Sequence, residues 1–163
     1  MSENLSIVSK ARYSYQPKLP KSLRKGAMKV AIQKGKATQS IKDQEKIAAL
    51  FPKTYGAPVV TFVEGTAPAA RPLNMGVVLS GGQAPGGHNV VAGIFDAIKS
   101  IHAESHLYGF LGGPSGLENG KYIDIDSKLI DRYRNTGGFD IIGSGRTKLE
   151  TEAQFDKCAA VVQ

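Results

Sequence analysis

Hydrophobic positions are sparse and only briefly periodic in the first part of the chain. Residues 40–51 carry apolar side chains at helical spacing, with Ser40 placed to cap the helix and Pro52 to end it. Residues 59–63 are β-branched or aromatic and favour a strand. The stretches around these two segments show no sustained period. We therefore interpret residues 1–73 as an N-terminal extension with a short helix and a linker.

From residue 74 onward, short apolar runs alternate with helical patterns. The expected strands are residues 75–79, 107–111 and 139–142, with a weaker one at 122–125 after an Asn-Gly turn. The expected helices are residues 89–103, a second that Asp126 or Ser127 caps, and a third that Thr151 and Gln154 open as a capping box. This alternation predicts an α/β fold, a Rossmann-like parallel sheet with flanking helices. A self-contained doubly wound domain has about five or six strands, so we expect residues 74–163 to be the first part of an incomplete domain.

The main information that composition adds is the uneven distribution of charged residues along the chain. The chain has a formal net charge of +7, and residues 1–40 hold nine Lys or Arg against one acidic residue. The remainder is close to neutral, so the extension is basic and the α/β part is not. A basic run of this kind is typical of a solvated tail or docking arm, and no nucleic-acid-binding signature accompanies it. We expect no nucleic-acid partner.

Two further features bear on the environment of the protein. Cys158 is the one cysteine, so it cannot form an internal disulfide, and it has no metal-type spacing around it. No apolar run approaches the roughly 20 residues needed to cross a bilayer, and the N-terminus lacks the apolar centre of a signal peptide. The expectation is a cytoplasmic protein without a membrane association.

The segment SGGQAPGGHN at residues 80–89 is the candidate ligand-binding loop of the chain, because it is rich in glycine and joins an expected strand to an expected helix. Backbone N–H groups and the helix dipole favour an anion at such a junction, and Gly81 and Gly82 leave room for phosphate oxygens. A phosphate or pyrophosphate site and a tight turn without a ligand both remain open. A Walker loop is excluded, since Gly87 and His88 stand at its Lys and Ser/Thr positions. A dinucleotide fingerprint is excluded by the glycine spacing and by the lack of an acid after residue 111.

Together with YGFLGGPSGL at 108–117 and TGGFDIIGSGR at 136–146, this segment resembles three ordered motifs of the phosphofructokinases. Gln83 and the extra glycine before His88 are typical of the pyrophosphate-dependent branch, particularly its long-chain members. The ATP-dependent branch usually has Asp in place of Gln83 and a shorter Gly-Met-Asn ending. Residues 11–20 are similar to the leader of the long-chain members. The resemblance implies the phosphofructokinase fold, with residues 74–163 as the first part of its donor-binding domain.

The resemblance also implies which residues contact the phosphoryl donor. Gly82 would contact it through its backbone, with Gly81 beside it, and Arg146 matches an arginine that contacts donor phosphates. Without a ligand, Arg146 would be a surface residue paired with Glu150. His88 would either add a donor to the same oxyanions or only cap and pack the helix.

The activity that the resemblance implies is reversible phosphoryl transfer from pyrophosphate to fructose 6-phosphate in glycolysis, with Mg²⁺ as cofactor and a homo- or hetero-oligomeric assembly. The family segments GGDDS and PKTIDGDLK, which supply the catalytic carboxylates and metal ligands, are absent from this sequence. We therefore assign no catalytic residue and no metal ligand, and expect the 163-residue chain to be inactive alone. An ATP-dependent 6-phosphofructokinase and a non-catalytic regulatory subunit of the same assembly are the alternatives.

Overall fold

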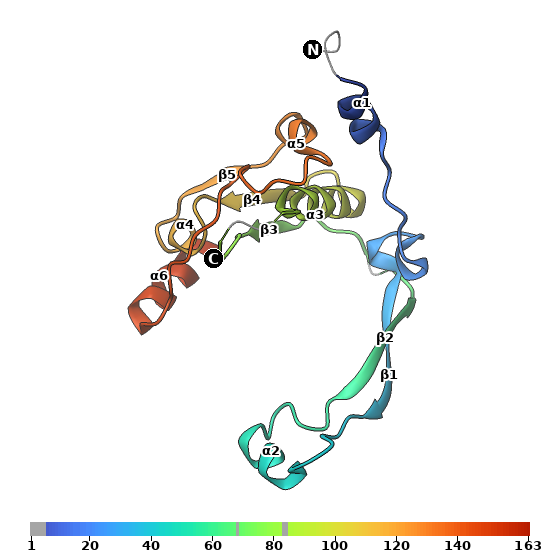
Figure 1. The fold of residues 1–163 in the computed structure, drawn as a ribbon, viewed down its shortest axis with the longest axis vertical. Coiled ribbons are helices and arrows are strands. Elements are labelled where there is room, and N and C mark those ends of the chain that lie inside the picture. The colour runs from blue at the N-terminus through green and yellow to red at the C-terminus, as the bar shows by residue number, and fades with distance from the viewer. Residues whose placement is uncertain (1–5, 68, 83–84) are drawn as a thin grey trace. The chain divides into compact units, whose positions relative to one another are not determined.

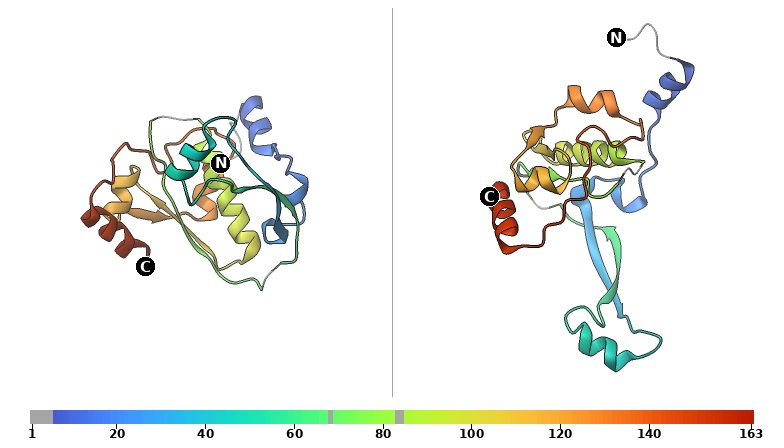
Figure 2. Two further views of the ribbon diagram at one scale, coloured as in Figure 1. Left: turned by 90° about the horizontal axis from the view of Figure 1, so that it is seen from below. Right: turned by 60° about the vertical axis from the view of Figure 1, so that its left-hand side comes forward.

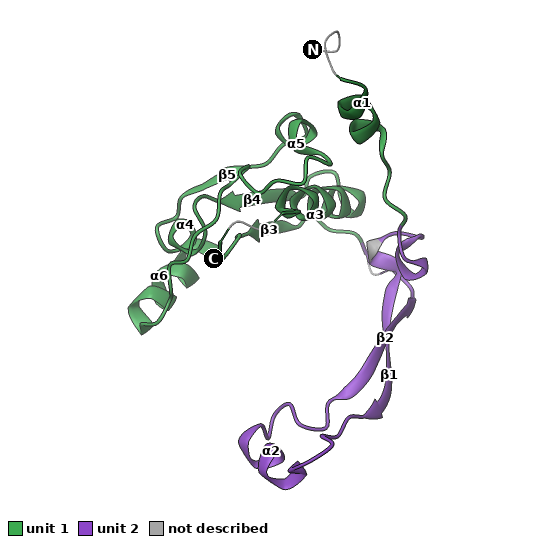
Figure 3. Cartoon of the chain, viewed as in Figure 1, with its two compact units in different colours: residues 1–18, 70–163 green, residues 19–69 purple. Residues whose placement is uncertain are grey.

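The computed structural model describes residues 6–67, 69–82 and 85–163, which fall into two compact units (Figure 3). Unit 1 combines the N-terminal segment up to Lys18 with everything from Ala70 onward, and unit 2 is the segment Leu19–Ala69 between them. Unit 1 is thus formed by two separate stretches of the sequence, and unit 2 is the single stretch between them.

Unit 1 is built on a three-stranded sheet in the order β3-β4-β5, which can be followed in Figures 1 and 2. Strands β3 (Asn74–Val77) and β4 (His106–Phe110) are parallel and are connected by helix α3 (Gly87–Ile101). Strand β5 (Tyr122–Asp124) pairs with β4 antiparallel, with Gly109 opposite Ile123. The α/β class is therefore confirmed, but the sheet is mixed and not wholly parallel. The connection from β4 to β5 contains a short helix at Pro114–Glu118, and the chain then returns alongside β4 in the opposite direction.

Three shorter helices follow β4 in unit 1: α4 (Pro114–Glu118), α5 (Ser127–Tyr133) and α6 (Glu152–Val162). The Asp126 side chain accepts a hydrogen bond from Leu129 N at 2.7 Å, which confirms the expected cap of α5. Thr151 and Gln154 form the expected capping box of α6. Helix α6 has no buried residue and lies beside α4.

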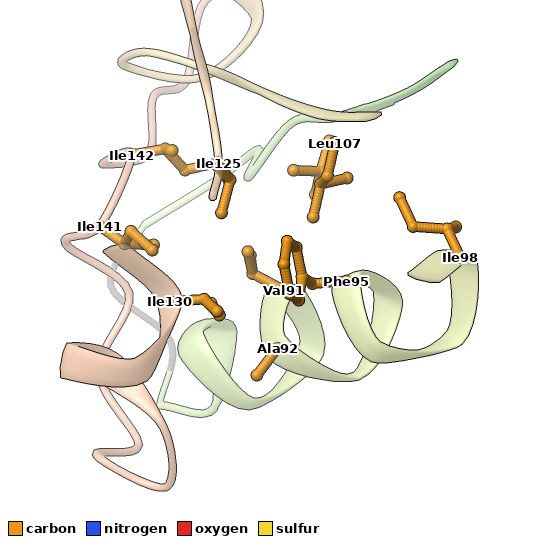
Figure 4. Close-up of a cluster of buried hydrophobic side chains, with 10 residues drawn as sticks. Val91, Ala92, Phe95, Ile98, Leu107, Ile125, Ile130, Ile141 and Ile142 are labelled. Atoms are coloured by element: carbon orange, nitrogen blue, oxygen red, sulfur yellow. The ribbon is translucent and has the colours of Figure 1, made fainter. Parts of the chain in front are cut away.

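One face of α3 forms the centre of the hydrophobic core, which Figure 4 shows in close-up. The apolar spacing read from the sequence lies on this face, as expected. The buried residues of this cluster are Val77, Val91, Ala92, Phe95, Ile98, Leu107, Ile125, Ile130, Ile141 and Ile142. They come from α3, from β3, β4 and the residue after β5, from α5 and from the segment after it, so the core ties these elements into one unit.

The expected strand at residues 139–142 is wrong, although Ile141 and Ile142 are buried as a strand there would require. The segment forms a turn and then crosses the carboxyl ends of β3 and β4. Its backbone bonds and those of the residues just after it go to two different loops: Gly112 N donates to Ile142 O, while Gly145 donates to Leu79 O and accepts from Gly81 N. In place of a ladder, the described residues form one isolated parallel bridge, between Ser80 and Gly145.

The N-terminal helix α1 (Ile7–Ser14) begins at Ser6, whose side chain accepts from Ser9 N. The chain around it is attached to the end of α5 and to the loop that follows. The Asn135 side-chain amide donates to Arg12 O at 2.9 Å and to Tyr15 O at 3.1 Å, and the Tyr13 hydroxyl donates to Arg132 O at 3.4 Å. The first residues of unit 1 thus bind to a loop more than a hundred residues later.

Unit 2 is an antiparallel ribbon of β1 (Val30–Ala37) and β2 (Pro58–Glu64), with helix α2 (Gln44–Leu50) between the strands. Two single-turn 3-10 helices, η1 (Lys21–Leu23) and η2 (Ala27–Lys29), precede β1. Helix α2 ends before Pro52 as expected, but its N-cap is Asp43 and not Ser40. None of the residues whose burial is described in this unit is buried.

No helix in the described part of the chain combines the length and the apolar character that a membrane span requires.

Candidate functional site

The three glycine-rich motifs converge at the carboxyl ends of β3 and β4. Gly81 N donates to Gly145 O at 2.8 Å, and Ser80 forms an isolated parallel bridge with Gly145. Gly112, directly after β4, donates its N–H to Ile142 O at 2.8 Å. In open α/β sheets, ligands bind in the crevice outside the carboxyl ends of parallel strands. The motifs read from the sequence therefore meet where this fold class binds ligands.

Close backbone packing explains why glycines recur in these segments. A β-carbon at Gly113 would run into the backbone of Gly145, and one at Gly145 would run into the carbonyl of Gly112. Gly113 also has φ +81°, which other residues adopt only under strain. The second and third motifs can lie this close only because neither carries a side chain at the contact.

Arg146 lies against Gly82. A β-carbon at Gly82 would stand 2.5 Å from Arg146 Nη2 and 3.3 Å from its Cζ. Both residues are accessible to solvent, and Gly81 beside them has φ +114°. The structure therefore brings together the three residues that the sequence assigns to the phosphoryl donor, while Gln83 and Ala84 lie outside the described residues.

The guanidinium of Arg146 has no hydrogen bond or ion pair with any described residue. The pairing with Glu150 that was expected in the absence of a ligand is not formed, since Glu150 lies 3.7 Å from Lys148 Nζ instead. The Arg146 cation thus lies beside a glycine loop at the carboxyl ends of the parallel strands, and this arrangement is suited to binding an anion.

His88 is buried, with 2% of its surface exposed, and both ring nitrogens have partners within unit 1. Thr136 Oγ1 donates to Tyr133 O, so it accepts from Nδ1–H of His88, 2.6 Å away. Nε2 accepts the N–H of Ile141 at 3.1 Å. Of the two roles considered for His88, the structure shows the packing one.

This arrangement holds the imidazole in its neutral form. Burial lowers the pKa of His88 below its ordinary value, and the Asp140 carboxylate, 3.0 Å from Nε2, partly offsets that effect. The contacts of His88 were not predicted from the sequence, because Thr136 and Ile141 lie far along the chain and belong to a motif noted only for its glycines and arginine.

No group of three or more His, Cys, Asp or Glu side chains in the described part of the chain is arranged to hold a metal ion. The N–H groups of Gly81, Gly112 and Gly145 are bonded within the protein, so the site offers the exposed backbone of Gly82 and one cation, Arg146. Chemically, these two residues can bind and orient an anionic group.

Similarity to known proteins is high over nearly the whole chain. It is 55% identical over 152 residues to a pyrophosphate–fructose 6-phosphate 1-phosphotransferase of Porphyromonas gingivalis, covering 93% of this chain and 27% of that protein. A protein of the same name from Treponema pallidum is 47% identical over 169 residues, covering 98% of this chain and 30% of the relative. In Arabidopsis thaliana, proteins named as beta 1 and alpha 1 subunits of this enzyme are 47% and 36% identical over 92% and 93% of this chain.

The chain spans less than a third of the length of these curated relatives. A scan against models of protein families gave no match.

Proposed function

The chain is a homologue of the pyrophosphate-dependent phosphofructokinases, and from this we propose that the protein containing it transfers a phosphoryl group reversibly between pyrophosphate and fructose 6-phosphate. The observation that carries the proposal is the convergence of the three glycine-rich motifs, with Arg146 against Gly82. The names of the relatives support the same reaction.

Within this reaction, we assign the phosphoryl donor to the Gly81-Gly82 loop and Arg146. A phosphate oxygen needs hydrogen-bond donors without side chains in the way, and Gly82 offers an accessible backbone. Arg146 adds a planar, permanently charged group that suits phosphate oxygens. Pyrophosphate has no base or ribose, so a site made of backbone and one cation can bind it without a base pocket.

Catalysis needs Mg²⁺ and a carboxylate that orients the attacking hydroxyl. The described residues do not form a metal site, so both contributions would come from other segments of the whole protein. The assembly is proposed to be a homo- or hetero-oligomer, since plant relatives are named as alpha and beta subunits. A cytoplasmic location remains a prediction from the sequence.

The test is steady-state kinetics of the full-length protein with fructose 6-phosphate, Mg²⁺ and either pyrophosphate or ATP. Product formation with pyrophosphate and little with ATP is the expected result. ATP as the better donor would place the protein in the other branch of the family and show that Gln83 does not report donor choice.

A second arm separates the catalytic protein from a regulatory subunit. The full-length protein is assayed alone and after mixing with a catalytic homologue. Turnover without the homologue supports the catalytic assignment. Stimulation of the homologue without turnover of its own would overturn it in favour of a regulatory role.

A further inference from the structure

His88 joins the first turn of α3 to the third glycine-rich motif through a set of short contacts. Two are backbone bonds: Gly86 N donates to Gly137 O at 2.6 Å, and His88 N donates to Gly138 O at 2.8 Å. Two more use the imidazole, whose nitrogens bond Thr136 Oγ1 and Ile141 N. The start of α3 and residues 136–141 therefore hold each other in one arrangement.

The ring itself is tightly enclosed. A β-carbon at Gly138 would lie 2.6 Å from His88 Cε1 and 3.0 Å from Nδ1, so only glycine fits over the imidazole. Tyr133 packs edge-on against the ring, with ring centroids 4.7 Å apart. An imidazole held from several directions has one orientation, and its Nε2 acceptor is thereby fixed in space.

The bond from Ile141 N to Nε2 lies at the start of the segment that ends at Arg146. Ile141 and Ile142 are buried beyond it, and Gly145 is then bound to the first loop by its N–H and its carbonyl. Both ends of this short segment are therefore bonded, one to His88 and the other to the first loop.

We propose that His88 is a positioning residue for the phosphoryl-donor site. By accepting the Ile141 N–H, it fixes residues 141–146 and so places the Arg146 guanidinium against Gly82. The inference rests on the proposed function, since it assumes that Arg146 contacts pyrophosphate. His88 itself is buried and acts on the donor only through this segment.

The test uses a pair of substitutions that divide the functions of the ring in the full-length enzyme. His88→Asn retains an amide donor near Nδ1 for Thr136 but does not reach the position of Nε2. His88→Gln places its carbonyl near Nε2 and can still accept the Ile141 N–H. Loss of one buried hydrogen bond corresponds to about a tenfold effect.

We expect His88→Asn to raise the KM for pyrophosphate about tenfold, with the KM for fructose 6-phosphate unchanged, while His88→Gln stays within about threefold of the wild type. In the double variant His88→Asn with Arg146→Ala, the KM should exceed that of Arg146→Ala by no more than about twofold, since both changes remove one contribution. Melting curves of each variant check that the fold is retained.

Three results would overturn the proposal. The first is a wild-type pyrophosphate KM in His88→Asn, and the second is an equal rise in that KM for His88→Asn and His88→Gln. The third is a double variant whose rise in KM equals the product of the rises in the two single variants. The proposed donor site has its own indicator in the Arg146→Ala single variant. If that variant leaves the pyrophosphate KM unchanged, the assignment of Arg146 to the donor is wrong, and the positioning role of His88 is wrong as well. If it raises the KM and His88→Asn does not, only the positioning role fails.

Discussion

Arg146 and Gly82 occupy adjoining space: the guanidinium lies where a side chain of residue 82 would have to begin. The two residues come from the first and third glycine-rich motifs, which the backbone bonds of Gly145 with Gly81 and Leu79 hold together. A change at either residue should therefore alter the same ligand contact, which gives two independent tests of the donor site.

Gly82→Val should severely reduce phosphoryl transfer in the full-length enzyme while leaving fructose 6-phosphate binding largely intact. The valine side chain would displace Arg146 and fill the space proposed for phosphate oxygens. The measurement is steady-state kinetics with each substrate varied separately, with a melting curve to exclude unfolding. A wild-type response to pyrophosphate would mean that the loop is only a turn.

Arg146→Ala should act on the same ligand more mildly. Removal of a charge-assisted contact costs about 1.5–3 kcal/mol, which corresponds to roughly a 10- to 150-fold rise in the KM for pyrophosphate. Lys148→Ala is the matched control, because Lys148 is a neighbouring exposed cation whose ion pair is with Glu150. A rise in the fructose 6-phosphate constant alone would show that the donor assignment of Arg146 is wrong.

The burial of His88 predicts a dependence of stability on pH. Its pKa in the folded protein is lowered, whereas the unfolded chain should titrate near the ordinary value of 6.5. As the pH falls below 6.5, the unfolded state takes up a proton that the folded state resists, so the free energy of unfolding decreases toward the folded pKa. Above the unfolded pKa this contribution is fully retained.

Denaturant titrations of wild type and His88→Gln between about pH 8 and pH 5, a range that spans the ordinary histidine pKa, measure this effect. The difference in unfolding free energy between the two proteins should change in favour of the variant as the pH is lowered. A difference that stays constant across that range would contradict the pKa shift.

Replacing glycine by alanine should change the free energy of unfolding in opposite directions at two positions. Gly93 lies in the middle of α3, exposed, and the position that its β-carbon would take is open space, so Gly93→Ala should stabilise by about 0.5–1 kcal/mol. A β-carbon at Gly109 in β4 would instead stand 2.5 Å from Ile142 Cγ2 and 2.9 Å from Ile125 Cδ1. Gly109→Ala should destabilise by about 1–3 kcal/mol through overpacking. Equal midpoints of chemical unfolding for the two variants would contradict the described packing.

Arg134 connects α5 to α3 through a bidentate pair. Its two terminal nitrogens each lie 2.7 Å from an Asp96 oxygen, and Nε lies 2.7 Å from Asp131. These carboxylates raise the pKa of Arg134, although the group is charged at any relevant pH. Because the carboxylates are half-exposed, Arg134→Gln should cost only about 1 kcal/mol, less at high salt.

Arg132→Gln is the control for this prediction, since the Arg132 side chain has no ion pair with another described residue. The midpoint of thermal unfolding at low and high salt is the readout. A loss for Arg132→Gln as large as that for Arg134→Gln would indicate a general charge effect and not the bidentate pair.

The parts of the fold that the sequence predicted depend on local signals. The apolar spacing of α3 and the caps at Asp126 and Thr151 are determined within one or two helical turns, and the structure has all three. The helix-like spacing around α2 was also correct, but its start was misplaced. Asp43 adopts a left-handed conformation with φ 52°, which the capping pattern at Ser40 does not reveal.

The parts that were missed depend on partners elsewhere in the chain. Strand β1 contains Lys34, Gly35 and Lys36 and has little intrinsic strand preference, so its pairing with β2 decides its structure. The apolar run at residues 139–142 was interpreted as a strand for the opposite reason, because burial alone does not distinguish a strand from a crossing segment. The antiparallel direction of β5 likewise depends on its pairing with β4, which the residues of β5 alone do not reveal.

For the candidate site, the sequence identified the glycine motifs but not the contacts among them. Gly81, Gly82 and Arg146 were selected by resemblance, and the structure brings them side by side. The linkage of His88 to Thr136 and Ile141 was not predicted, since no spacing rule connects residues of different motifs.

The attachment of Asn135 to the N-terminal segment limits how early unit 1 can fold while the protein is being synthesised. Arg12 and Tyr15 precede Asn135 by 123 and 120 residues. Ribosomes add about 5–20 residues per second, so the segment that follows α1 waits on the order of ten seconds for the loop that binds it. Within that interval the whole of Leu19–Ala69 is synthesised. The inserted unit is therefore translated completely before the unit that encloses it in sequence can close.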